Sequence, residues 1–172
     1  MVNLIQKHDS RAIANEVLDK AWESEISLTK MQLIKIVYFI HGWSLAFFGK
    51  PLVEDRPQVW KLGPVYPRLY KSLAGYTSES VNKKIIHKET GIPHVAGFLL
   101  PNQRQLIDDI TSGYGKLHAF VLSERTHEKG TPWDIAMKSK GLYSEIDDET
   151  LVAHFKELMK KRNIPPEHYN TI

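Results

Sequence analysis

Serine and lysine stand three residues apart at two places in this sequence, a spacing at which a lysine amine can activate a serine hydroxyl as a nucleophile. The pairs are Ser27 with Lys30 and Ser80 with Lys83. Neither pair lies near the companion motifs that accompany this spacing in serine enzymes, and the sequence contains no Gly-x-Ser-x-Gly elbow. We therefore expect no catalytic serine.

The eight histidines are the other residues that could catalyse a reaction or hold a metal. His118 and His127 fall around one predicted helix but lack the i, i+4 spacing of a paired zinc site. His41 lies in an apolar helix and is expected to be a hydrogen-bonded core residue. The sequence also lacks cysteine, a His-Glu-x-x-His motif and a phosphate-binding Gly-rich loop. We expect no metal, no cofactor and no enzymatic activity. The enzyme alternative, a small hydrolase, would need a buried polar cluster around His118, His127 and Glu124 beside a pocket.

Length and composition are those of one folded domain. A chain of 172 residues with 42% hydrophobic and 25% charged residues is long enough to bury a core, so we expect a single domain over residues 1–172. The sequence has no cysteine and no long apolar run near its start. Both features favour a cytoplasmic protein.

The net charge of +3 and the pI near 9.0 are mildly basic, which argues against a dedicated nucleic-acid binder. Two clusters carry the charge: Lys83, Lys84 and Lys88, and then Lys156, Lys160, Lys161 and Arg162. We interpret both clusters as solvated faces. A DNA-binding regulator is the alternative, and it would need Lys156, Lys160 and Arg162 on one exposed face of the last helix.

The elements that would position a functional surface are predicted to be helices around one central helix. Residues 28–48 form a long apolar stretch, and residues 36–40 within it are apolar all round. A helix with no polar side is buried by neighbouring elements or by lipid. Polar residues such as Lys35 interrupt this one too often for a membrane span. We therefore expect the core helix of a soluble fold, with Tyr38 and Phe39 inside.

Capping residues mark the ends of the other helices. The expected caps and helix starts are Asp9 or Ser10, Thr29, Pro67, Pro101, Thr131 with Pro132, and Asp147. The last helix spans residues 147–162 and is followed by a short tail. The residues near Val59 and Trp60 favour β structure, with Pro57 before them, and residues 84–87 are a second possible strand. The fold class is therefore mainly α, a compact helical domain around the 28–48 helix with at most a short edge strand or small hairpin.

The order and spacing of residues from Leu28 to about Lys138 match a known pattern. An apolar helix with Ile34, Lys35, Ile36 and Tyr38 is followed by Gly49, Pro51 and Leu52, then by Trp60, Gly63, Pro64, Val65, Pro67 and Tyr70, and later by His127 and Pro132-Trp133. This signature region, about 28–138, resembles the Panacea domain, the SocA-like antitoxin family that also occurs in phage-associated proteins.

The resemblance implies an antitoxin: a helical protein that neutralises a cognate toxin by direct protein–protein binding. For some members of the family it also implies a role as a proteolytic adaptor, with a cellular protease as second partner. It implies no membrane partner. A surface for protein recognition is what a stable domain without catalytic motifs would be expected to offer.

The predicted toxin contact is the turn and helix start from Trp60 to Tyr70, with Trp133 at its border. We expect Gly63 and Pro64 to form a turn, and a backbone fixed by glycine and proline presents side chains with little loss of entropy on binding. The predicted contact residues are Lys61, Gly63, Pro64, Val65, Tyr66, Pro67, Tyr70 and Trp133. The competing interpretation is a rigid corner that packs Val65 and Tyr70 onto the central helix.

Overall fold

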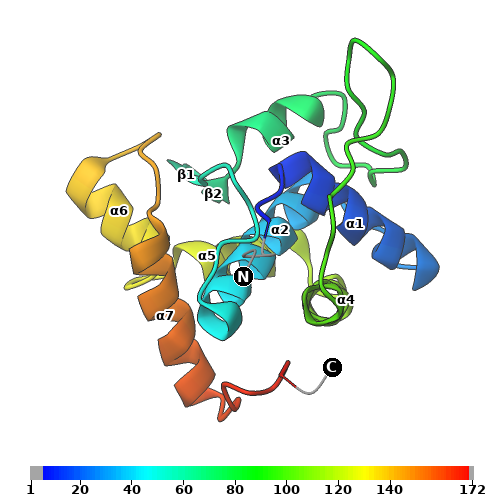
Figure 1. Ribbon diagram of the computed structural model, residues 1–172. Coiled ribbons are helices and arrows are strands. Elements are labelled where there is room, and N and C mark those ends of the chain that lie inside the picture. Colours follow the sequence, from blue (N-terminus) through cyan, green and yellow to red (C-terminus); the bar gives the residue numbers. More distant parts are fainter. Residues whose placement is uncertain (1–5, 171–172) are drawn as a thin grey trace.

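Helix α2 (Lys30–Phe48) runs through the middle of the computed structural model, which describes residues 6–170 (Figure 1). Thr29 caps it as predicted: its hydroxyl accepts a hydrogen bond from the Gln32 N–H, and the Gln32 side chain accepts one from the Thr29 N–H. Gly49 ends the helix in the left-handed conformation at φ +64°, which glycine adopts without strain. The helix begins two residues later than the sequence predicts.

The middle of α2 has no exposed side. Every residue from Leu33 to Ala46 is buried, and Tyr38 and Phe39 lie in the core as predicted, at 2% and 5% exposure. The helix has the length and apolarity of a membrane span, but 83% of that stretch is buried inside the fold. It is therefore the core helix that the sequence predicts.

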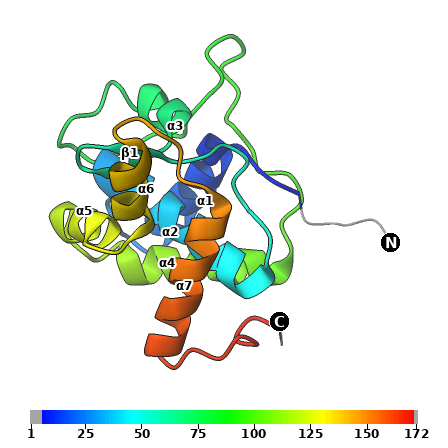
Figure 2. The ribbon, with the colours of Figure 1, turned by 90° about the vertical axis from the view of Figure 1, so that its left-hand side faces the viewer.

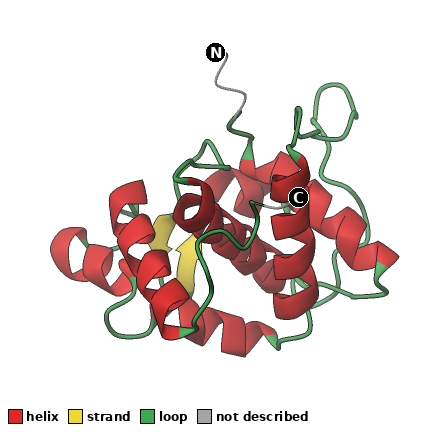
Figure 3. Ribbon diagram, turned by 60° about the horizontal axis from the view of Figure 1, so that its bottom comes forward, coloured by secondary structure: helices red, strands yellow, loops and turns green. Residues whose placement is uncertain are grey.

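Six further helices surround α2 within residues 6–170. They are α1 (Ser10–Glu23), α3 (Pro67–Ser72), α4 (Pro101–Tyr114), α5 (Ala119–His127), α6 (Pro132–Lys140) and α7 (Asp148–Lys161). Helices α1, α4, α5 and α7 all pack directly on α2, and Figure 2 shows α7 lying in front of it. The expectation of a mainly α fold is confirmed, and Figure 3 shows how small the strand content is.

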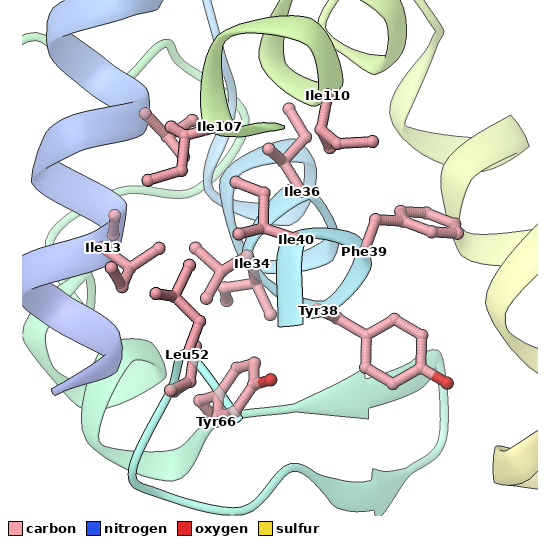
Figure 4. Packing of buried hydrophobic residues seen from close by; sticks show 14 of the residues in the cluster. Ile13, Ile34, Ile36, Tyr38, Phe39, Ile40, Leu52, Tyr66, Ile107 and Ile110 are labelled. Carbon is pink, nitrogen blue, oxygen red and sulfur yellow. The ribbon is translucent and has the colours of Figure 1, made fainter. Parts of the chain in front are cut away.

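Isoleucines supply much of the contact between these helices. Figure 4 shows Ile36 and Ile40 of α2 meeting Ile107 of α4 and Ile13 of α1. On the α7 side a glycine allows close approach: a Cβ at Gly42 would lie 2.1 Å from a ring carbon of Phe155. The core side chains therefore fill the space between α2 and the helices around it.

The predicted helix boundaries hold where a capping residue marks them. Asp9, Thr131 and Asp147 each accept a hydrogen bond from the first turn of α1, α6 and α7, and proline occupies the first position of α3, α4 and α6. Trp22 is different. It continues the apolar stripe of α1 that begins at Ile13, but it lies in the last turn of the helix with 36% of its surface exposed.

Strands β1 (Gln58–Trp60) and β2 (Gly63–Val65) form one antiparallel hairpin, in which Trp60 pairs with Gly63 and Gln58 with Val65. The small hairpin is confirmed, but the expected turn is displaced. Lys61 and Leu62 make the turn, whereas Gly63 and Pro64 belong to β2. Proline fits there because β2 is a short edge strand.

The tail after α7 folds back onto the core. Tyr169 is 4% exposed, packs edge-on against Phe47 at 4.8 Å between ring centroids, and donates a hydrogen bond to Asp109 at 2.9 Å. The tail thus covers the C-terminal end of α2 and joins it to α4.

Candidate functional site

Three side chains from three helices hold the β1–β2 hairpin by its carbonyl oxygens. Trp133 Nε1 of α6 donates to Trp60 O at 2.8 Å, and Ser123 Oγ of α5 donates to Leu62 O at 2.7 Å. Lys35 Nζ of α2 donates to Pro64 O at 2.8 Å. The hairpin is therefore fixed to the helical core at both strands and at its turn.

Lys35 is the deepest of these anchors. Its side chain is 0% exposed, and burial lowers the pKa of its amine to about 7. Gly63 lies directly against it: a Cβ at this position would be 2.7 Å from Lys35 Nζ and 2.6 Å from Thr126 Oγ1. Gly63 also has φ +102°, a conformation that side chains disfavour. Position 63 thus requires glycine for two independent reasons.

A segment from the far end of the chain pairs with the other edge of β1. The N–H of Val59 donates to Ser144 O at 2.9 Å, and the N–H of Tyr143 donates to Val59 O at 2.7 Å. Tyr143 has φ +64°, which is uncommon for a residue with a large side chain. Its ring lies edge-on to Trp60, with 5.7 Å between the ring centroids.

The outer side of the hairpin carries a row of aromatic rings. Trp60 lies between Tyr143 and Tyr70, and the Trp60 and Tyr70 ring centroids are 4.8 Å apart. Lys30 Nζ lies 3.6 Å from the centre of the Tyr70 ring, in a cation–π contact. We define the hairpin surface as Lys30, Trp60, Lys61, Leu62, Tyr70 and Tyr143. Its most exposed apolar side chains are Tyr143 at 65% and Leu62 at 54%.

A groove of about 500 Å³ borders the hairpin surface between α2, the hairpin and the end of α3. The lining residues are Lys30, Met31, Ile34, Lys35, Trp60, Lys61, Leu62, Val65, Tyr70, Ala74, Tyr76 and Thr77. Three of these residues are lysines and none is acidic. The groove therefore combines an apolar wall with positive charge.

The structure divides the predicted contact residues into two groups. Lys61 and Tyr70 are exposed on the hairpin surface, Pro67 is half-buried, and Trp133 is half-buried where it holds Trp60 O. Gly63 and Pro64 are buried, and so is Val65, which lines the groove. These three residues form strand β2 and support the exposed residues of the hairpin surface from the buried side.

The expectation that Tyr66 is presented at the surface is wrong. Tyr66 is 0% exposed, because β2 runs directly into α3 there and turns the side chain into the core. Figure 4 shows its ring beside Leu52. Its hydroxyl is buried and has no hydrogen-bond partner within residues 6–170, and burial raises the pKa of Tyr66 well above its usual value.

Four residues of the hairpin surface are not among the eight predicted contact residues: Trp60 and Leu62 lie within the predicted Trp60 to Tyr70 stretch, and Lys30 and Tyr143 lie outside it. Leu62 carries a weak signal, since it is a large apolar residue at a two-residue turn. Lys30 and Tyr143 carry none. Lys30 lies roughly 30 positions before the hairpin and Tyr143 roughly 80 positions after it. Only the tertiary fold brings residues so far apart into contact, and local sequence patterns do not indicate such contacts.

Three of the histidines make hydrogen bonds that stabilise the fold. His41 is the hydrogen-bonded core residue that the sequence predicts: Nδ1 accepts from the Val53 N–H, so Nε2 carries the proton that it donates to Asp148 Oδ1 at 2.9 Å. That hydrogen bond holds the pKa of Asp148 below its usual value. His118 Nδ1 caps α5 by accepting from the Phe120 N–H, and His127 Nδ1 donates to Ser123 O.

No group of three or more His, Asp or Glu residues in the part of the chain that the structure describes is arranged to hold a metal ion. The cluster that a hydrolase would need is not formed either, because His118 and His127 are each bonded within their own helix end.

The basic residues required of a DNA-binding last helix are exposed, but one of them is engaged within the chain. Lys156 and Lys160 are exposed on α7. Arg162, which follows α7, is also exposed, and its guanidinium donates to the Tyr114 hydroxyl at 3.3 Å and lies over the Trp43 ring. Lys161 pairs with Glu157 at 2.7 Å. These contacts of Arg162 weaken the alternative of a DNA-binding last helix.

Comparison with known proteins places this geometry in a family. The family model described as "Antitoxin SocA-like, Panacea domain" matches residues 33–134, a range that contains most of α2 and the whole hairpin. The chain is also similar to "Antitoxin SocA" of Caulobacter vibrioides (strain NA1000 / CB15N), with 29% identity over 170 residues, covering 94% of this chain and 89% of that protein. No solved structure matches it. The chain therefore belongs to the SocA-like antitoxin family with a Panacea domain.

Proposed function

We propose that this protein is an antitoxin that neutralises a cognate toxin protein in the cytoplasm by direct binding, as one domain, and that the hairpin surface with its groove is the contact. Membership of the SocA-like family supports the antitoxin role. The shape and chemistry of the hairpin surface support its assignment as the contact.

One observation carries the assignment of the surface: a row of aromatic rings, with Trp60 half-buried between the exposed Tyr70 and Tyr143, sits on a backbone that is already fixed. Trp133, Ser123 and Lys35 hold the hairpin carbonyls, so binding would order little that is not ordered beforehand. Aromatic side chains on a rigid support are typical anchors of protein interfaces. The left-handed backbone at Tyr143 places one such ring at the surface, and strain of this kind gathers at functional positions.

The charge of the groove indicates what the toxin would present. Lys30 and Lys61 lie at the groove beside apolar walls. A complementary partner segment would therefore combine apolar side chains with at least one carboxylate. Charge complementarity of this kind mainly sets the specificity and rate of association.

The test is neutralisation in cells that produce a cognate toxin. The variant Lys61→Glu/Tyr143→Ala removes a ring and reverses a charge on the hairpin surface, and both side chains are exposed. The matched control, Lys156→Glu/Phe98→Ala, makes the same two changes at exposed residues outside the groove lining. We expect the hairpin variant to lose rescue of growth while the control retains it. Equal rescue by both variants would exclude the hairpin surface.

The amount of toxin in the rescued cells separates the two modes of neutralisation. If the antitoxin blocks the toxin, as we propose, the toxin accumulates in an inactive complex. If it is a proteolytic adaptor, the toxin disappears in cells with active proteases and reappears when the protease is deleted. Rescue without any physical association between the two proteins would contradict direct binding in either mode.

A further inference from the structure

A second cavity, of about 540 Å³, lies apart from the hairpin. It is enclosed by α1, the end of α3 and the loop that follows α3, which projects from the body beside these helices in Figure 1. Its lining includes six basic or titratable side chains: Arg11, Lys83, Lys84, His87, Lys88 and His94. The lysines that the sequence analysis interprets as a solvated face therefore gather around a cavity.

Positive charge in this cavity exceeds what its neighbours neutralise. Arg11 is bonded to Asp9 and Lys84 to Asp19. Lys83 and Lys88 form no ion pair with any residue that the structure describes, and Glu89 is the single acidic residue in the lining. An anionic ligand would gain two unengaged ammonium groups and the edge of the Arg11 guanidinium.

The loop that carries these residues is fastened at its base by one buried amide. Asn15 of α1 is 2% exposed. Its Nδ2 donates to the carbonyl oxygens of Ile85 and His94, both at 2.8 Å, and its Oδ1 accepts from the Ile85 N–H at 2.8 Å. Both ends of the loop are therefore fixed to α1, and the basic side chains are held on a defined backbone.

His94 in the lining of this cavity has a polar atom without a partner among the described residues. Its side chain is 4% exposed and its Nε2 is buried without a hydrogen bond, while the exposed ring of His87 lies against it, tilted by 33° with 3.6 Å between the ring centroids. An unpaired buried nitrogen is unfavourable unless a bound group satisfies it. Burial, with the charges of Arg11 and His87, lowers the pKa of His94, an effect that a nearby anion would oppose.

We propose that this cavity binds a small phosphate-bearing ligand. Phosphate oxygens accept hydrogen bonds from ammonium, guanidinium and imidazole groups together, which are the donors gathered here. The volume of about 540 Å³ accommodates a ligand of nucleotide size. Tyr76 lines this cavity and also the groove beside the hairpin, so the bound ligand has a route to influence the proposed toxin contact.

Nuclear magnetic resonance of the imidazole protons of His87 and His94 tests the proposal on the full chain. The probes are inorganic phosphate, pyrophosphate and ADP, each compared with sodium chloride at the same ionic strength. We expect saturable shifts of both histidines with pyrophosphate or ADP and none with chloride. The arm that shifts at the lowest concentration shows whether a free phosphate anion or a nucleotide is the better ligand. Shifts that follow ionic strength alone would overturn the proposal.

Charge reversal locates the binding. Lys83→Glu/Lys88→Glu alters two exposed side chains of the loop, and Lys156→Glu/Lys160→Glu makes the same change in net charge on α7. We expect the loop variant to bind pyrophosphate about tenfold more weakly and the α7 variant to bind like the wild type. Circular dichroism melting confirms that both variants fold. Equal weakening in both variants, or binding only of a single-stranded RNA oligonucleotide with no response to pyrophosphate or ADP, would refute a small-ligand site.

Discussion

A buried lysine anchors the surface that we assign to toxin binding. Lys35 is fully buried, and its amine is bonded to the carbonyl of Pro64 in the hairpin. A charged ammonium is unfavourable in such surroundings, so the amine gives up its proton more readily than usual. Lys35 is also one of the signature residues of the apolar helix. Its hydrogen bond to the Pro64 carbonyl explains how a lysine can be buried in that helix.

The buried amine makes stability depend on pH. Its pKa falls from the ordinary 10.5 to about 7 on folding. Between these values the unfolded chain binds more protons than the folded one, so the free energy of unfolding rises with pH, by at most about 1.4 kcal/mol per pH unit. Below pH 7 both states are protonated and the contribution is constant. Urea titrations from pH 6 to pH 10 should show this rise in the wild type and lose it in Lys35→Met. Parallel pH profiles would contradict a depressed lysine pKa.

The glycine beside this lysine gives a second prediction. Gly63→Ala would force a Cβ to within 2.7 Å of Lys35 Nζ at a φ of +102°, and we expect a loss of about 2–4 kcal/mol in the free energy of unfolding. Gly130→Ala is the control, because Gly130 has φ +82° but nothing within 4 Å of its Cβ position. It should lose only about 1–2 kcal/mol, the cost of the backbone conformation alone. Equal losses would mean that crowding at Gly63 is relieved without cost.

At the scale of the elements, α2 organises the molecule, since four long helices pack directly on it. Ile36 is 0% exposed at its centre. Ile36→Asp buries a charge with no partner and should lower the free energy of unfolding by several kcal/mol, on the order of the whole stability of a domain. Ile135→Asp places the same change at a residue that is 48% exposed, and it should stay within about 0.5 kcal/mol of the wild type. Chemical denaturation measures both, and similar melting of Ile36→Asp and the parent would remove α2 from the core.

The sequence predicts elements where the cause is local. A capping side chain or a proline acts within one helical turn, so the starts of α1, α3, α6 and α7 follow from Asp9, Pro67, Thr131 and Asp147 alone. The hairpin turn is predicted in the wrong place because Gly63 is required by distant atoms, Lys35 Nζ and Thr126 Oγ1, and not by a turn. In the sequence, a glycine required by a turn cannot be distinguished from a glycine required by crowding from distant side chains.

The candidate site is only partly predictable for the same reason. Lys61 and Tyr70 follow from the Trp60 to Tyr70 stretch, but Tyr66, which looks equally suitable as an aromatic at a turn, is buried where β2 enters α3. Tyr143 reaches Trp60 through hydrogen bonds between its own backbone and Val59. Nothing in the residues near 143 indicates that pairing.

At the scale of the whole molecule, the chain has two distinct faces of interest. The hairpin surface combines rigid aromatic rings with lysines, and the cavity beside α1 is lined by basic side chains, including His94, whose Nε2 has no partner among the described residues. The basic end of α7 lines neither the cavity nor the groove, and the exposed Arg162 that follows it is engaged with Tyr114 and Trp43. Family membership and surface chemistry therefore favour recognition of a protein over recognition of DNA.

Direct binding through the hairpin surface is the central claim, and calorimetric titration of the purified chain with the purified toxin tests it most directly. We predict saturable binding by the wild type and by Lys156→Glu/Phe98→Ala. We predict binding that is at least about tenfold weaker for Lys61→Glu/Tyr143→Ala, as the loss of an interface anchor implies, with unchanged thermal stability. Equal affinity for all three proteins, or no heat of binding with a toxin that the chain neutralises in cells, would contradict the claim.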